Sequence, residues 1–201
     1  MDRERVPRAA VDSPIHCRGG SRPPDGIRRS RRQGCGPDHP ANPVVRDLCK
    51  CFGMTQHDRP EIRSLADLTP EDMTRISEGS FTDLIGLKYT EISLERVTAE
   101  WVVSPQQYQP AGIVNGGVYC TVIETLASVG GGVWYGDRGR VVGVNNNTDF
   151  LRAVREGVLR GVATPLHRGR LQQLWQVAIS DEQDRVVARG QVRLQNLPAT
   201  E

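Results

Sequence analysis

The sequence lacks long apolar runs. No hydrophobic stretch reaches the roughly 18 residues that a membrane-spanning helix needs, although 37% hydrophobic residues in a chain of 201 are enough for the core of one ordinary domain. The first 30 residues also lack the apolar segment of a secretory signal. The sequence therefore excludes a membrane protein and predicts a cytoplasmic protein with no membrane partner.

The sequence also lacks the cysteine pairs of a zinc site. Four of its five cysteines, Cys17, Cys35, Cys49 and Cys51, lie near the start of the chain, and none forms a C-x₂-C pair. Cys49 and Cys51 together with His57 leave a metal site open as an alternative. A disulfide framework is not expected in a cytosolic chain. No metal and no separate cofactor are predicted.

Charge is distributed unevenly along the chain. Residues 1–53 contain ten Arg and one Lys against six acidic residues, a balance of +5, whereas residues 54–201 have a balance of −3. The first segment is rich in Arg, Pro and Gly and shows no periodicity of 2 or 3.6 residues, so it cannot bury enough apolar surface to fold. We therefore predict a disordered extension over residues 1–66 and a folded domain over residues 67–198.

The basic run Arg28–Arg32 could bind nucleic acid or another acidic surface. The run has no interleaved aromatic residues, and residues 1–66 show no helix-turn-helix pattern. A solvated tail is therefore the preferred interpretation, and no nucleic-acid partner is predicted. A further alternative is that translation starts at Met54 and that the preceding segment is an artefact of start-site choice.

Hydrophobic periodicity predicts an α+β domain. Thr69 is placed to cap a helix that has Pro70 at its first position and ends near Gly79. Residues 88–93 and 96–103 alternate as two strands of a hairpin. The second strand has one apolar face, made up of Val97, Ala99, Trp101 and Val103.

A strongly apolar helix follows the hairpin. It opens at Gly116, carries apolar residues at helical spacing, and is expected to stop at Gly130–Gly132. Four strand-like segments come after it, over residues 140–146, 158–166, 171–181 and 186–197. One antiparallel sheet packed on one helix accounts for this order of elements.

The apolar helix contains one carboxylate, Glu124. The first amides of the helix, at Gly116 and Gly117, have no intrahelical acceptor and can donate to an oxyanion. Glu124 lies two turns after Gly117, roughly 10 Å along the axis, which is too far for both to serve one carbonyl group. A second, antiparallel copy of the helix would bring its amino end beside Glu124, so the spacing indicates a site shared across a dimer.

Ser128 stands one turn after Glu124, where its hydroxyl is placed to orient a water molecule held by the carboxylate. A Glu in partly apolar surroundings tends toward a raised pKa, which suits a general base. The alternative is that Glu124 lies at the helix edge and pairs with an Arg.

These motifs together resemble the hotdog-fold thioesterases, specifically the phenylacetate-type (PaaI-like) branch that hydrolyses aryl- and acyl-coenzyme A. That family has Gln or Asn, Pro and Gly before His-Gly-Gly, then a Glu or Asp in the central helix. The matching stretch is Gln109-Pro110-x-Gly112-x-x-Asn115-Gly116-Gly117 followed by Glu124. The likeness covers about residues 70–197 and is greatest to the group of 1,4-dihydroxy-2-naphthoyl-CoA and 4-hydroxybenzoyl-CoA thioesterases. It implies a hotdog fold, an antiparallel β-sheet wrapped around one long central helix.

The resemblance also implies roles for the motif residues. Gln109 and the Gly116 amide would polarise the thioester carbonyl, while Glu124 of the neighbouring subunit attacks it or activates water, with Ser128 assisting. Coenzyme A would be part of the substrate rather than a cofactor. The minimum assembly would be a homodimer with shared active sites, and family likeness suggests a tetramer.

The resemblance places the coenzyme A contacts on a larger set of residues. They are Gly117, Gly143, Phe150, Leu151, Arg152, His167, Arg168, Gly169 and Arg170. The three guanidinium groups in this set suit phosphate, and surface arginines with no ligand are the alternative. The acyl pocket between helix and sheet is expected to include Val122, Trp134, Tyr135 and Phe150.

One position departs from the family pattern. Asn115 stands where the family usually has His, and an Asn side chain donates a hydrogen bond but does not titrate near neutrality. Two alternatives to an enzyme therefore stay open, a hotdog protein that binds acyl-CoA without turnover and a regulator that senses acyl-CoA. Asn145–Asn147 is expected to form a strand end or bulge that lines the cleft, with a plain polar edge as the alternative.

Overall fold

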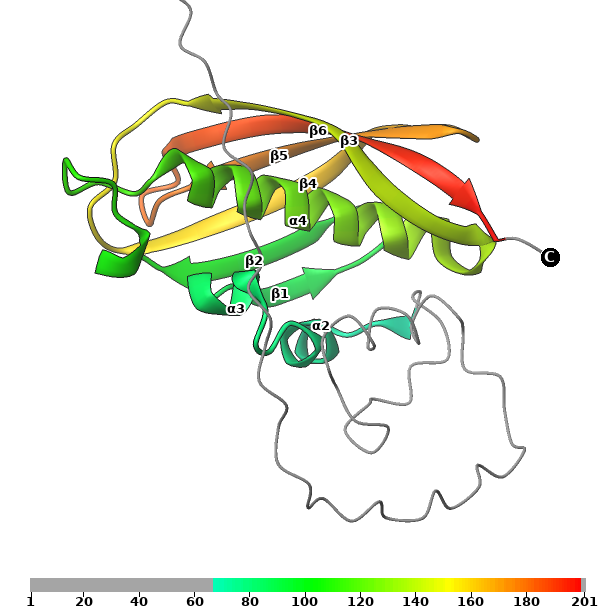
Figure 1. Cartoon of the computed structure of the whole chain (residues 1–201), viewed down its shortest axis with the longest axis horizontal. Coiled ribbons are helices and arrows are strands. Elements are labelled where there is room, and N and C mark those ends of the chain that lie inside the picture. Colours follow the sequence, from blue (N-terminus) through cyan, green and yellow to red (C-terminus); the bar gives the residue numbers. More distant parts are fainter. Residues whose placement is uncertain (1–66, 200–201) are drawn as a thin grey trace, which may run out of the picture. The chain divides into compact units, whose positions relative to one another are not determined.

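The computed structural model describes residues 67–199 (Figure 1). The predicted extension over residues 1–66 and the alternative metal ligands Cys49, Cys51 and His57 lie outside the described residues. Within residues 67–199, no helix combines the length and the apolarity needed to cross a membrane. The same residues contain no cluster of three or more His, Cys, Asp or Glu side chains placed to hold a metal ion.

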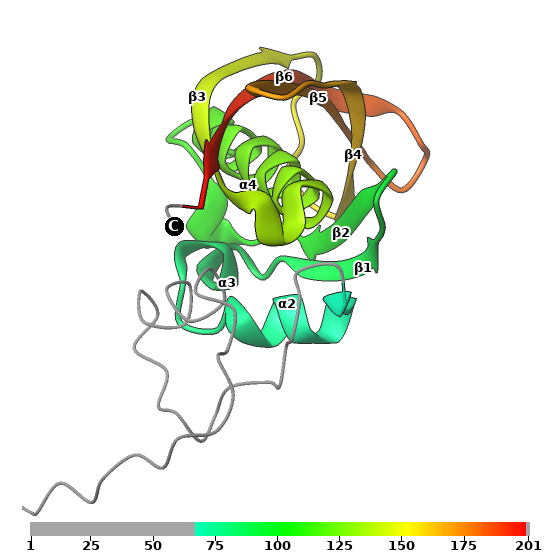
Figure 2. The ribbon, with the colours of Figure 1, turned by 90° about the vertical axis from the view of Figure 1, so that its right-hand side faces the viewer.

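One six-stranded antiparallel sheet and one long helix make up the domain. In chain order the elements are α2 (Pro70–Ile76), α3 (Phe81–Ile85), β1 (Lys88–Ile92), β2 (Val97–Val102), η2 (Pro105–Gln107), α4 (Gly116–Tyr135), η3 (Gly136–Arg138), β3 (Gly139–Phe150), β4 (Val158–Arg168), β5 (Gln172–Ser180) and β6 (Val186–Pro198). The strand order is β1-β2-β4-β5-β6-β3, so β1 and β3 are the edge strands. Figure 2 shows the sheet curling around α4. The predicted α+β class and hotdog architecture are confirmed.

The two short helices before the sheet begin at hydroxyl caps. The Thr69 hydroxyl accepts from the Asp72 amide in a capping box, and Pro70 is the first helical residue, as predicted. This helix ends at Ile76 rather than near Gly79, because Ser80 caps a second helix, α3, that the sequence pattern did not predict. After α3, the predicted β1–β2 hairpin is closed by a 2.8 Å hydrogen bond from the Ser93 amide to the Arg96 carbonyl. The predicted buried face of β2 is confirmed at Val97, Ala99, Trp101 and Val103.

The predicted stop of the long helix at Gly130–Gly132 is wrong, because α4 continues to Tyr135. Two of these glycines lie where the helix touches the sheet. A Cβ on Gly130 would come within 2.7 Å of the Trp175 ring, and one on Gly131 within 2.3 Å of Leu194 Cδ1. Close packing of the helix on β5 and β6 therefore requires small residues and outweighs the low helix propensity of glycine.

The glycines of α4 provide a matched stability test. Gly130→Ala is expected to lower the free energy of unfolding by about 1–3 kcal/mol, because Trp175 is fully buried and its indole nitrogen is held by Gln173. Gly132 has no atom of the described residues within 4 Å of its Cβ position, so Gly132→Ala should stabilise by about 0.5–1 kcal/mol through helix propensity alone. Urea unfolding of both variants measures the difference. Equal stabilisation by the two substitutions would contradict the steric explanation.

Candidate active site

Glu124 lies half-buried on the side of α4 that faces the edge strand β3. The Asn146 side-chain amide donates to Glu124 Oε2 at 3.2 Å. On the same strand, Gly143 lies so close that an added Cβ would be 1.9 Å from Glu124 Oε1. The carboxylate is therefore held directly against β3.

A β-bulge explains why Gly143 and Asn146 reach the same carboxylate. The register of β3 on β6 shifts between Gly143 and Asn145, where Val144 is the extra residue. Gly143 pairs with Leu194 and Asn146 pairs with Val192, both fully buried, so both positions face α4 although they are three residues apart. The bulge lies just before Asn145–Asn147, where a strand end or bulge was predicted, and these three residues themselves pair in regular register with β6 inside the edge strand. Asn146, however, was not among the predicted site residues.

Burial raises the pKa of Glu124, and the hydrogen bond from Asn146 acts in the opposite direction. No ion pair among residues 67–199 includes Glu124. The alternative in which Glu124 pairs with an Arg is therefore not supported within the described residues. A partly desolvated carboxylate with no cationic partner is suited to act as a base or nucleophile.

Asn115 caps the amino end of α4. Its Oδ1 accepts from the Gly117 amide at 2.8 Å, so the Gly117 amide is occupied. The Gly116 amide, the first of the helix, has no intrahelical acceptor and points out of the helix end. The Phe150 ring lies over Gly116, where an added Cβ would be 2.9 Å from Phe150 Cζ. Of the two predicted glycine donors, only Gly116 has an amide without an acceptor in the described part of the chain.

Gln109 lies in the loop before α4. Its Oε1 accepts from the Ala111 amide at 3.0 Å, which leaves the Nε2 hydrogens to donate. The turn is closed by the Gly112 amide on the Gln109 carbonyl, and Gly112 has a φ of +72°, which glycine adopts easily. A second glutamine, Gln107, is buried and donates to the Ile85 and Val102 carbonyls, so it supports the loop.

One protomer does not bring all predicted catalytic residues together. The unbroken helix separates Glu124 from the Gly116 amide by eight residues, about 12 Å along its axis. Ser128 lies one turn beyond Glu124 on the helix, as the spacing predicted, and its side chain is half-buried. This separation agrees with the prediction that Glu124 of one subunit acts together with the Gly116 amide of another.

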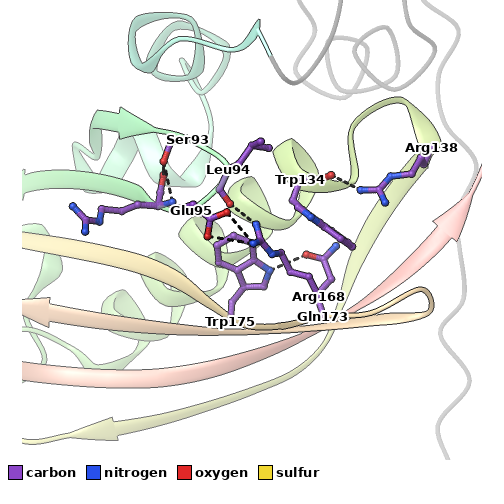
Figure 3. Close-up of polar contacts among 9 residues, drawn as sticks. Ser93, Leu94, Glu95, Trp134, Arg138, Arg168, Gln173 and Trp175 are labelled. Carbon is purple, nitrogen blue, oxygen red and sulfur yellow. Dashed lines mark hydrogen bonds and ion pairs between the residues drawn. The ribbon is translucent and has the colours of Figure 1, made fainter.

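Arg168 is engaged within the fold (Figure 3). Its guanidinium donates to the Leu94 carbonyl at 2.7 Å and to Glu95 Oε1 at 2.9 Å, and lies 5.7 Å from the Trp134 ring centroid. Arg138 lies over the same ring at 4.3 Å. These contacts tie β4 to the β1–β2 hairpin and favour the alternative of a structural arginine at position 168.

The acyl pocket predicted from the sequence is not brought together in one protomer. Trp134 and Tyr135 lie at the carboxyl end of α4, whereas Phe150 lies over its amino end and packs against Tyr119 at a ring distance of 6.2 Å. Val122 is fully buried in the core. Because α4 continues past the predicted stop at Gly130–Gly132, Trp134 and Tyr135 lie within the helix, at the end opposite Phe150.

The remaining predicted contact residues fall into two groups. Leu151 and Arg152 are exposed and line a pocket of about 560 Å³ between the β3–β4 loop and the β5–β6 turn, together with Arg155 and Arg185. His167 packs against Gly169 beside the exposed Arg170 at the far end of β4. The eleven residues of β4 separate the groups by about 33 Å, too far for one nucleotide in one protomer.

A family model described as the thioesterase superfamily matches residues 111–188. A Mycobacterium tuberculosis protein provisionally named an esterase is 53% identical over 122 residues, 59% of this chain and 87% of that protein. Its solved structure has a TM-score of 0.58 at 52% identity and covers 60% of this chain and 98% of its own.

Two further proteins extend the comparison. The proofreading thioesterase EntH of Cronobacter turicensis is 36% identical over 118 residues, 59% of this chain and 86% of that protein. The Escherichia coli PaaI protein from the phenylacetic acid degradation operon has a TM-score of 0.58 and covers 65% of this chain and 94% of its own. At 16% identity, that structure shows a shared fold alone.

Proposed function

Since the chain belongs to the thioesterase superfamily, we propose that it hydrolyses an acyl- or aryl-coenzyme A thioester to the free acid and coenzyme A. The observation that carries the proposal is the Glu124 carboxylate, half-buried and without an ion pair among the described residues, against Gly143 and Asn146. Such a carboxylate is a competent nucleophile or general base.

The proposed active unit is a homodimer paired through β3. This edge strand is 12 residues long, and no other strand between residues 67 and 199 pairs with its outer side. It also exposes Val142 by 39% and Val144 by 48%. Antiparallel pairing with a second copy of β3 would set two α4 helices side by side and bring Gln109 and Gly116 of one copy toward Glu124 of the other. Pairing of two such dimers into a tetramer is proposed from family likeness.

In the proposed reaction, Gln109 Nε2 and the Gly116 amide donate to the thioester oxygen as it becomes negative. Glu124 attacks the carbonyl carbon to form an anhydride that water then hydrolyses, or it removes a proton from water that attacks directly, and Ser128 orients that water. A carbon–oxygen bond forms, the carbon–sulfur bond breaks, and the sulfur leaves as the coenzyme A thiolate. The exposed Arg152 and Arg155 in the same pocket supply positive charge for the nucleotide phosphates, whereas Arg185 is paired with Asp181 at 2.8 Å.

A second candidate is an acyl-CoA-binding protein without turnover. It is favoured by Asn115, which cannot transfer a proton and whose side-chain oxygen already accepts from Gly117. Because the binder would keep the contacts to coenzyme A, affinity alone does not separate it from the enzyme. Turnover does.

The test is release of free thiol from benzoyl-, 4-hydroxybenzoyl-, 1,4-dihydroxy-2-naphthoyl-, hexanoyl- and palmitoyl-CoA by the full chain. We expect turnover on the order of 1 s⁻¹ or faster on at least one ester, and the ranking assigns the acyl class. Absence of turnover on all five esters, with coenzyme A binding measured by calorimetry, would establish the binding protein instead.

A further inference from the structure

We propose that Asn146 is a positioning residue that holds one oxygen of the Glu124 carboxylate and thereby leaves the other oxygen to react. The inference rests on the proposed function, because it takes Glu124 as the reacting carboxylate. Asn146 Nδ2 donates to Glu124 Oε2 at 3.2 Å and to the main-chain carbonyl of Cys120 at 3.0 Å. The same amide group therefore contacts both the carboxylate and the preceding turn of its helix.

The orientation of the Asn146 amide is set by the groups that accept from it. Thr148 Oγ1 donates to Asn146 Oδ1 at 2.8 Å. The Cys120 carbonyl can only accept, so the NH₂ group of Asn146 must face α4. A 180° flip would turn the amide oxygen toward the Cys120 carbonyl and the Glu124 carboxylate and break both of these hydrogen bonds, whereas the Thr148 hydroxyl could accept in place of donating. The donor to Glu124 is thus preset before any substrate arrives.

The other carboxylate oxygen, Oε1, has different surroundings. It accepts no hydrogen bond from the residues between 67 and 199 and lies in the space that Gly143 leaves by having no side chain, where a Cβ would be 1.9 Å away. Because the β3 bulge turns both Gly143 and Asn146 toward α4, one strand anchors Oε2 and makes room for Oε1. Oε1 is therefore assigned as the oxygen that meets the substrate carbon or water.

The groups around Glu124 leave Asn146 as its main electrostatic partner. On the side of β3 that faces this point of α4, Gly143, Asn146 and Thr148 do not titrate, and Cys120 is the titratable group one turn earlier on α4 itself. No ion pair within the described domain involves Glu124. Burial raises the pKa of Glu124 and the Asn146 hydrogen bond lowers it. Removing Asn146 should therefore raise that pKa further.

The expected result for Asn146→Ala is a fall of about tenfold in kcat, the effect of losing one hydrogen bond to a charged group. The acid limb of the pH profile of kcat/KM should also move to higher pH, because Glu124 would protonate more readily. Asn146→Asp keeps the shape but replaces the donor by a second carboxylate, which should move the limb further in the same direction. Gln176→Ala, which removes an exposed amide side chain on β5 away from β3, is the matched control and should leave the profile unchanged.

A titration of Glu124 by carbon-13 NMR in wild type and Asn146→Ala gives a readout that does not need turnover. If Asn146→Ala fails to fold, Thr148→Val removes the hydroxyl that holds the amide and should shift the midpoint less, in the same direction. Retained turnover in Glu124→Gln would refute the proposed role of Glu124, whatever Asn146 does. Loss of turnover in Glu124→Gln, together with wild-type acid limb and NMR midpoint in Asn146→Ala, would overturn the inference about Asn146 alone.

Discussion

Glu124→Gln is expected to lower turnover of the best thioester substrate by about 10³-fold or more. The amide has the size of the carboxylate and can still accept from Asn146, so the main change is the loss of negative charge. An uncharged amide neither attacks the thioester carbonyl nor removes a proton from water at a useful rate. Single-turnover thiol release measures this loss without interference from product release.

The same substitution should not destabilise the fold. Burial raises the pKa of Glu124 in the native protein, so between its unfolded and native pKa values the native state binds more protons than the unfolded state. Stability therefore falls as pH rises through that window, and the ionised carboxylate disfavours folding at neutral pH. Glu124→Gln removes this charge, so its melting temperature at pH 7 should equal or exceed that of wild type.

Glu100→Gln on β2 is the matched control, since it makes the same chemical change at a position with no role in the proposed site. Its turnover should equal that of wild type. If Glu124→Gln kept more than a tenth of wild-type turnover, Glu124 would not be the reacting carboxylate.

Gly143→Ala is expected to lower kcat by about 10²-fold, because a Cβ 1.9 Å from Glu124 Oε1 must displace the carboxylate. A displacement of about 1 Å at a reacting group is enough for a loss of this size. Gly143 is not among the glycines with positive φ, so alanine fits its backbone without strain. The expected defect is therefore in kcat, with the circular dichroism spectrum unchanged.

The control for this substitution is Gly132→Ala, the same chemical change on α4, where no atom of residues 67–199 lies within 4 Å of the added Cβ. Its kcat should match wild type. A wild-type kcat in Gly143→Ala as well would show that the carboxylate needs no space at Gly143 for catalysis.

Much of the fold could be predicted from local sequence signals. Thr69 and Pro70 marked the start of α2, and the alternation of Val97, Ala99 and Trp101 gave the buried face of β2, because capping and side-chain periodicity are local properties. The end of α4 could not be predicted in this way. Whether Gly130 stops a helix depends on Trp175, which is 45 residues further along the chain.

The residues of the candidate site also divide into those with a local sequence signal and those whose contacts depend on distant parts of the chain. Glu124 and Gly116 stood out because a charge and paired glycines are conspicuous in an apolar helix. Asn146 did not, because its approach to Glu124 depends on the extra residue Val144 and on the register with β6. Arg168 shows the opposite case. Its guanidinium group suited phosphate binding, but its contacts with Leu94 and Glu95, more than 70 residues earlier in the chain, could not be predicted from the sequence.

Asn115 bears on which bonds the protein can break. Its side-chain oxygen is committed to the first turn of α4, and its amide has no proton to release near neutrality. On the proposed mechanism, a departing group beside this helix end leaves with its own negative charge. A thiol, with a pKa of about 8.5, does so readily, whereas an alkoxide is far more basic and needs a proton as it departs. On that mechanism, the helix cap would favour thioesters over oxygen esters, independently of the acyl group.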